Sequence, residues 1–194
     1  MKLRNVLILL FAIVAIGSCA KDPFSTRDNE LPTTKPGTFI PPTAPQIVLE
    51  NLRLSYSELV IGNFIQCLDS AFVFTFDFIE VTPGDTVWDF SREVTLTQKM
   101  FSEFNANKVN QRITIQFGLL LDQPDILLDT TATIIRSYTL SVTDTLGTVK
   151  DNFHGIARFD LVESTFNFWS LRRWQDLHAD AQSNSWAEFK NAYR

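Results

Sequence analysis

Alternating phenylalanines in one short segment constrain the fold of this chain more than any other feature. Phe72, Phe74, Phe76 and Phe78 are separated by single residues, and a period of two places their side chains on one face of a strand. Further segments favour extended structure, and we predict strands over 109–121, 131–143, 149–162 and 167–175. Strands with one apolar face need a sheet that is covered on that face.

Helical patterns precede the first strand. Thr43, followed three residues later by Gln46, predicts a capping box, and Pro45 suits the first turn of a helix that begins there. Ser57 is the predicted cap of a second short helix, which carries an apolar stripe. These two helices would supply the cover that the sheet needs.

Two more helices are predicted later in the chain. One follows Asp89, after a turn predicted at 83–85, and the other follows a second capping box made by Ser185 and Glu188. Helices, a strand, a helix and then a series of long strands form an α+β order. The predicted fold is therefore a curved antiparallel sheet wrapped around the N-terminal helices.

Four segments carry a family resemblance: Val48–Tyr56 as the helical start, Phe72–Phe76 as the first strand, Phe168–Asp176 as the last strand and Ser185–Arg194 as the end. In these segments the chain resembles small bacterial lipoproteins of the nuclear-transport-factor-2-like superfamily, the cystatin-like α+β roll. Polyketide-cyclase-like and ketosteroid-isomerase-like proteins belong to the same superfamily. The resemblance covers residues 46–194 and implies a cone-shaped roll. It implies no particular reaction, because one fold hosts enzymes, binding proteins and assembly proteins alike.

The N-terminal segment resembles a bacterial lipoprotein signal. Lys2 and Arg4 precede an apolar run over 6–16, and small residues then lead to Cys19. The run is too short for a membrane-spanning helix, which needs about 20 residues. The resemblance to a lipobox implies that the signal peptide, residues 1–18, is removed and that Cys19 carries fatty acyl chains such as palmitate. An ordinary secretory signal is the alternative.

The rest of the chain divides into two parts. Residues 19–43 comprise the lipidated cysteine and a Pro/Thr-rich segment, which we predict to be a flexible tether because it holds too few large apolar residues to fold alone. Residues 44–194 are predicted to form a single α+β roll domain. Proline favours extended backbone, so the tether would hold the domain away from the membrane.

Charge and cysteine content exclude several classes of protein. The formal net charge is −5, and removal of Lys2 and Arg4 would leave 15 basic against 22 acidic residues. Such an acidic chain is not expected to bind nucleic acid, so acyl chains rather than charge would hold it to the bilayer. With Cys19 acylated, Cys67 has no intrachain partner and is predicted to be a buried thiol, with a reactive nucleophile as the alternative.

Arginines in the predicted strands are the candidate ligand-binding residues. Arg136 shares an alternating register with Tyr138, and Arg173 shares one with Trp169, while Arg158 lies on a third strand. One interpretation is a cone that presents these five residues to an anionic or carboxylate ligand. The alternative is cross-strand pairing of the arginines with acidic residues, namely Asp144, Asp160, Glu163 or Asp176.

Catalytic and metal-binding patterns are weak in this sequence. An isomerase-like site needs an aspartate base beside a tyrosine and a second acid, and Asp77, Tyr138 and Asp160 are the available residue types. Asp77 is out of register with the alternating phenylalanines, so we expect it to be solvated. His154 and His178 are expected at a strand edge or on the surface, and neither has metal-ligand spacing. We therefore assign no catalytic residue, metal or cofactor.

These observations favour a lipid-anchored protein of the bacterial cell envelope, on the outer membrane and facing either the periplasm or the surface. Its domain is expected to bind a small ligand or a protein partner without catalysis. The alternatives are an isomerase- or cyclase-type enzyme that uses the cone, and a structural subunit of an envelope complex. The expected partners are the lipid bilayer through acylated Cys19, an envelope protein or small ligand, and a second copy of the chain through the sheet.

Overall fold

The computed structural model of the protein describes residues 37–77, 87–180 and 183–193. The helices in these ranges are α2 (Pro45–Glu58), α3 (Ile61–Cys67), α4 (Phe90–Ala106) and α5 (Trp186–Asn191). The strands are β1 (Leu68–Thr75), β2 (Val87–Asp89), β3 (Gln111–Leu119), β4 (Ile126–Leu127), β5 (Thr131–Asp144), β6 (Val149–Glu163) and β7 (Trp169–His178). The order of helices and strands agrees with the predicted α+β order.

The described strands form one sheet in the order β2-β1-β7-β6-β5-β3, and the short β4 pairs with β5 outside this path. Adjacent strands are antiparallel, apart from β1 and β7, which are parallel. The α+β roll is confirmed, but the prediction of a wholly antiparallel sheet is wrong at this pair. A tight turn forces antiparallel pairing, whereas β1 and β7 are separated by α4 and by the rest of the sheet.

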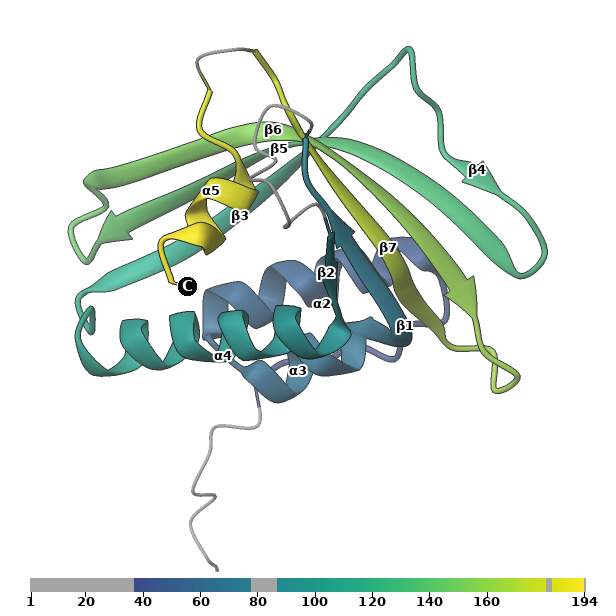
Figure 1. The fold of residues 1–194 in the computed structure, drawn as a ribbon, viewed down its shortest axis with the longest axis horizontal. Coiled ribbons are helices and arrows are strands. Elements are labelled where there is room, and N and C mark those ends of the chain that lie inside the picture. Colours follow the sequence, from purple (N-terminus) through teal and green to yellow (C-terminus); the bar gives the residue numbers. More distant parts are fainter. Residues whose placement is uncertain (1–36, 78–86, 181–182, 194) are drawn as a thin grey trace, which may run out of the picture. The chain divides into compact units, whose positions relative to one another are not determined.

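The helices lie on one side of the curved sheet (Figure 1). α2 packs against β3 and β7, α4 packs against β1, and α5 lies between the sheet and α4. The core between these layers is strongly aromatic, and its largest fully buried side chains include Trp88, Trp174, Trp186, Tyr56, Phe64, Phe72, Phe74, Phe104 and Phe159. Each such side chain removes a large apolar area from water, so this layer contributes most of the folding free energy.

The alternating register of the first strand is confirmed. Phe72, Phe74 and Phe76 are all buried, as a period of two requires. Phe78 and the turn predicted at 83–85 lie outside the described residues. In β5 the same rule holds, since Ile134, Tyr138, Leu140 and Val142 all face the core.

The helix starts agree with the predictions in part. Asp89 caps α4 by accepting a hydrogen bond from the Arg92 amide, and Ser185 and Glu188 form the predicted capping box of α5. The predicted capping box at Thr43 is wrong. The N-cap of α2 is Ala44, which makes no side-chain bond, although Pro45 does occupy the first turn.

The predicted start of the second helix is also wrong. Ser57 lies in the last turn of α2, where its hydroxyl bonds to the Leu54 carbonyl, rather than at the start of α3. α2 ends at Leu59, whose φ of 57° is left-handed, and α3 begins after Val60. A left-handed residue is a common helix end, and here leucine takes the position that usually favours glycine.

Residues 38–42, at the end of the predicted tether, make hydrogen bonds with the domain. The Asn51 side chain pairs with both backbone groups of Ile40, at 2.9 Å and 2.6 Å. The Trp169 amide donates to the Pro42 carbonyl at 2.8 Å. This segment is therefore attached to α2 and to the start of β7. Among the described residues, no helix has the length and apolar character that a membrane span requires.

Candidate functional site

The five predicted ligand-binding residues lie on two faces of the sheet. Arg136, Tyr138 and Trp169 are buried on the helix-covered face. Arg158 and Arg173 are exposed on the opposite face. The structure therefore does not bring the three arginines together around one ligand.

A β-bulge explains the position of Arg173. Asp160 pairs with Arg173 and Leu161 pairs with Leu171, so Arg172 is an extra residue in β7. A bulge shifts the alternation by one residue, and Arg173 therefore faces away from Leu171. The predicted shared face of Arg173 and Trp169 is wrong for this reason.

Arg136 is paired with a carboxylate that sequence analysis missed. Its Nη1 and Nη2 donate to the two oxygens of Asp125 at 2.5 Å and 2.7 Å, and only 8% of the residue is exposed. The bond from Arg136 lowers the pKa of Asp125, and a bond from Gln46 adds to this effect. Asp125 lies before β4 and is not one of the four predicted partners. The pair satisfies the arginine charge internally.

The outer-face residues Arg158 and Asp160 interact within one strand. Arg158 Nε donates to Asp160 Oδ1 at 3.2 Å, and the Thr133 hydroxyl donates to the same oxygen at 2.8 Å. Asp160 therefore lies on the face opposite Tyr138 and cannot form the isomerase-like acid pair considered above. Exposed pairs of this kind contribute little to stability.

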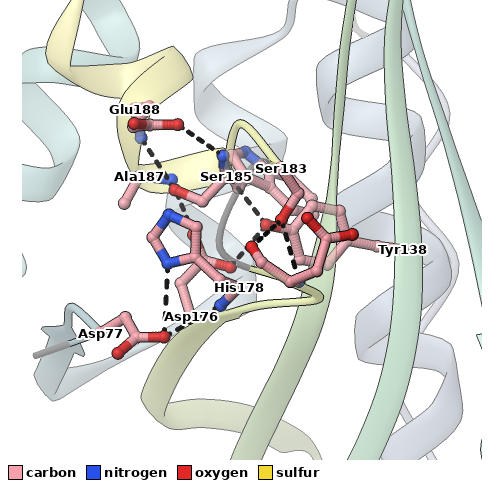
Figure 2. Close-up of polar contacts among 10 residues, drawn as sticks. Asp77, Tyr138, Asp176, His178, Ser183, Ser185, Ala187 and Glu188 are labelled. Atoms are coloured by element: carbon pink, nitrogen blue, oxygen red, sulfur yellow. Dashed lines mark hydrogen bonds and ion pairs between the residues drawn. The ribbon is translucent and has the colours of Figure 1, made fainter. Parts of the chain in front are cut away.

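Tyr138 and Asp176 connect the sheet to α5 (Figure 2). The Tyr138 hydroxyl donates to Asp176 Oδ1 at 2.7 Å and accepts from the Trp186 amide at 2.7 Å. Asp176 Oδ2 accepts from the Ala187 amide at 2.7 Å. Both amides belong to the first turn of α5, which has no intrahelical acceptors for them. The two side chains therefore act as an additional cap that docks α5 on the sheet.

Asp77 and His178 form a second polar pair beside this network (Figure 2). Asp77 Oδ2 accepts from the His178 amide at 3.1 Å and lies 3.3 Å from His178 Nδ1. Both side chains are at least nine-tenths buried. The predictions of a solvated Asp77 and of an edge or surface position for His178 are therefore wrong. Strand β7 continues to His178, and the parallel pairing of Thr75 with Gln175 brings Asp77 close to the end of this strand.

A buried ion pair lies deeper in the core. Lys190 Nζ of α5 donates to Glu93 Oε1 of α4 at 2.6 Å, and both side chains are almost completely inaccessible. Burial lowers the pKa of Lys190, while the Glu93 carboxylate opposes this effect. Sequence analysis missed this pair, because Glu93 and Lys190 occupy ordinary positions on helices of mixed polarity.

Two further polar groups in the core, the Tyr56 hydroxyl and the Cys67 thiol, have pKa values raised by burial. Burial raises the pKa of Tyr56 well above its usual range, and the nearby Glu93 adds to this effect. The Cys67 thiol donates to the Asn63 carbonyl, and burial raises its pKa to about 12. The prediction of a buried Cys67 is confirmed. Within the described ranges, no three histidine, cysteine or acidic side chains come together in a way that could hold a metal ion.

These contacts define the interior as a closed polar and aromatic network. Trp186 is fully buried at its centre, with ring centroids 4.4 Å from Trp174, 5.1 Å from Tyr56 and 5.2 Å from Tyr138. The oxygens that an isomerase-like site would direct at a substrate bond instead to α5. The network thus couples the sheet, α4 and α5.

Solved structures of other proteins share this fold at low sequence identity. The β subunit of the benzoate 1,2-dioxygenase from Burkholderia mallei is similar over 74% of this chain and 89% of its own, with a TM-score of 0.56 and 10% identity. Aln2 from a Streptomyces species is similar over 67% of this chain and 84% of its own, with a TM-score of 0.52 and 13% identity.

A further similar structure is a protein with a cystatin-like fold from Nostoc punctiforme, which covers 71% of this chain and 90% of its own, with a TM-score of 0.43 and 11% identity. No protein-family model matches the sequence, and the search of curated proteins found no match. The TM-scores above 0.5 establish a fold shared with the first two proteins, and identities of 10% and 13% leave the activity open.

Proposed function

We propose that this chain is a lipoprotein of the bacterial cell envelope whose domain binds a protein partner without catalysis. The anchoring part rests on the N-terminal sequence, in which a basic start and a short apolar run lead to Cys19. Two or more acyl chains on Cys19 would hold the protein on a bilayer stably. The binding part rests on the domain.

The observation that carries the binding part is the occupied interior. Trp186 and Lys190 of α5 are buried in the interior, where an enzyme of this shape would need room for a substrate. Tyr138 and Asp176, which have the chemistry of an isomerase-like site, already bond to α5. This arrangement favours a binding or assembly domain over an isomerase or cyclase.

Exposed apolar side chains at one end of the sheet supply a surface for a partner. Ile126, Leu127 and Leu128 lie in and after β4, and Phe166 and Phe168 lie in the turn between β6 and β7. The Glu163 amide donates to the Thr130 carbonyl, which brings the two loops together at the same end of the sheet (Figure 1). We call these five side chains the apolar rim. Grouped exposed apolar residues are typical of protein interaction sites.

The similarity to a dioxygenase β subunit is compatible with this proposal. By its name that protein is one part of a larger assembly, and it has this fold with a TM-score of 0.56. A domain with a filled interior and an apolar rim is suited to be one part of a larger assembly.

Membrane fractionation tests the anchor. We expect Cys19→Ser to release the protein from membranes, because the acyl chains can no longer be attached. The control is Cys67→Ser, which removes the other cysteine. If the Cys19 variant stays in the membrane fraction, the lipoprotein proposal is wrong.

Photo-crosslinking in intact cells tests the rim. A photoreactive residue in place of Phe166, which is 82% exposed, should give a defined protein adduct. The matched control is Leu146, which is 90% exposed but lies in the turn at the other end of β6. Equal adducts from both positions, or none from Phe166, would contradict a partner surface at the rim.

A further inference from the structure

Three side chains from three elements surround the ammonium group of Lys190. Nζ lies 3.9 Å from the centroid of the Trp174 ring and 4.0 Å from that of Phe74, and it donates to Glu93 Oε1 at 2.6 Å. Trp174 belongs to β7, Phe74 to β1 and Glu93 to α4. We call these three side chains the cage. α5 contributes the cation and, at a longer distance, the Trp186 ring, whose centroid lies 6.0 Å from Nζ.

The aromatic walls of the cage are fixed by the sheet. Phe74 and Trp174 are cross-strand partners in the parallel pair, with ring centroids 5.3 Å apart and planes at 68°. Trp88 stacks on Phe74 at 5.5 Å. The walls therefore have a structural support that does not depend on Lys190, and a cage that is formed in advance loses little entropy on binding.

The cage has the chemistry of a site for organic cations. Faces of tryptophan and phenylalanine attract cations and disfavour anions, and a buried carboxylate needs a positive partner. Glu93 Oε2 is buried and has no hydrogen-bond partner in the described part of the chain. Lys190 is tied to a helix and bonds only one carboxylate oxygen, whereas a free alkylammonium ion has the same three N–H donors without this tether.

We propose that the cage is a binding site for organic primary ammonium ions, and that Lys190 is its resident, replaceable cation. Lys190 is the last residue but one of α5, so unwinding of that single turn releases the ammonium group while Trp186 stays in place. Helix ends open locally at a lower cost than the whole fold. This inference depends neither on the lipid anchor nor on the apolar rim.

The first test removes the resident cation. In Lys190→Ala the cage is vacant, and n-butylammonium, which copies the lysine side chain, should bind and raise the melting temperature by about 4 °C at ten times its Kd. Neutral n-butanol should not do so, nor should n-butylammonium act on the double variant Glu93→Gln/Lys190→Ala. The matched control is Lys108→Ala, since Lys108 lies over the Phe104 ring at 4.9 Å but is partly exposed.

The second test uses the wild-type full chain and stands alone if Lys190→Ala does not fold. The ligand n-butylammonium is added at one hundred times its Kd for the variant, or at 100 mM if that Kd is not measurable. It should speed hydrogen exchange in the peptide 186–193 and leave the exchange of β5 unchanged. Equal stabilisation by n-butanol and n-butylammonium overturns the cation site. Unchanged exchange in the wild type overturns the replaceable role and makes Lys190 a fixed structural residue.

Discussion

Removing Glu93 should destabilise the protein in a pH-dependent way. In Glu93→Leu the Lys190 ammonium group is left between apolar side chains. It has lost the carboxylate to which it bonds at 2.6 Å in the wild type. Lysine can escape this state by losing its proton. Deprotonation from an unfolded pKa of about 10.4 costs about 1.4 kcal/mol per pH unit, which sets a ceiling of about 4.6 kcal/mol at pH 7 and about 1.9 kcal/mol at pH 9.

The sign of the pH dependence follows from proton binding. Burial lowers the pKa of Lys190, and Glu93 opposes that effect in the wild type. Without Glu93 the folded-state pKa falls further, so the unfolded variant binds more protons than the folded one at neutral pH. Its stability therefore rises with pH until the unfolded lysine also titrates. We expect the destabilisation by Glu93→Leu to shrink steadily between pH 7 and pH 9.

Urea unfolding followed by tryptophan fluorescence measures this effect at each pH, provided that the m-value stays constant. The matched control is the double variant Glu93→Leu/Lys190→Met, in which apolar side chains replace both charges. It should unfold within about 1 kcal/mol of the wild type, with no added pH dependence. A loss below about 1 kcal/mol at pH 7, or the same loss at both pH values, would refute the buried pair.

Other predictions concern the core, the Cys67 thiol and the Arg136–Asp125 pair. Trp186→Ala should lose about 4 kcal/mol in urea unfolding, because it empties the centre of an aromatic cluster, whereas the exposed Phe166→Ala should change stability by less than about 0.5 kcal/mol. Cys67 should not react with a thiol reagent at pH 8 until the protein unfolds, because burial raises its pKa to about 12; rapid labelling of folded protein would contradict its burial. Arg136→Leu should reduce stability at neutral pH but not at pH 2, because the lowered pKa of Asp125 contributes stability that is lost as the pH falls through it; equal losses at both pH values would refute this linkage.

Patterns along the chain predicted most of the fold. The phenylalanine alternation fixed the face of β1, and the capping box at Ser185 marked the start of α5, because both signals involve residues close in sequence. The parallel pairing of β1 with β7 and the bulge at Arg172 were not predicted. They depend on contacts between segments far apart in the chain, and no local pattern reports them.

The candidate site was predicted less well. Arg136 and Tyr138 were placed correctly on the covered face, but Asp125 and Asp176 were not identified as their partners. The partner of a loop carboxylate such as Asp125 is the cation that the tertiary fold places beside it, and this cannot be read from the local sequence. Lys190 was missed because lysine is among the residues that are almost never buried, and only its position facing Glu93 makes burial acceptable.

The position of α5 after every strand in the sequence has a consequence for biosynthesis. Until the ribosome has added Trp186 and Lys190, Glu93 of α4 and the sheet residues Tyr138 and Asp176 lack their final bonds. Each unmet polar group in an apolar layer carries a penalty of about 1–3 kcal/mol, which is a large part of the stability of a small domain. A chain cut short before α5 should therefore remain a substrate for chaperones and proteases.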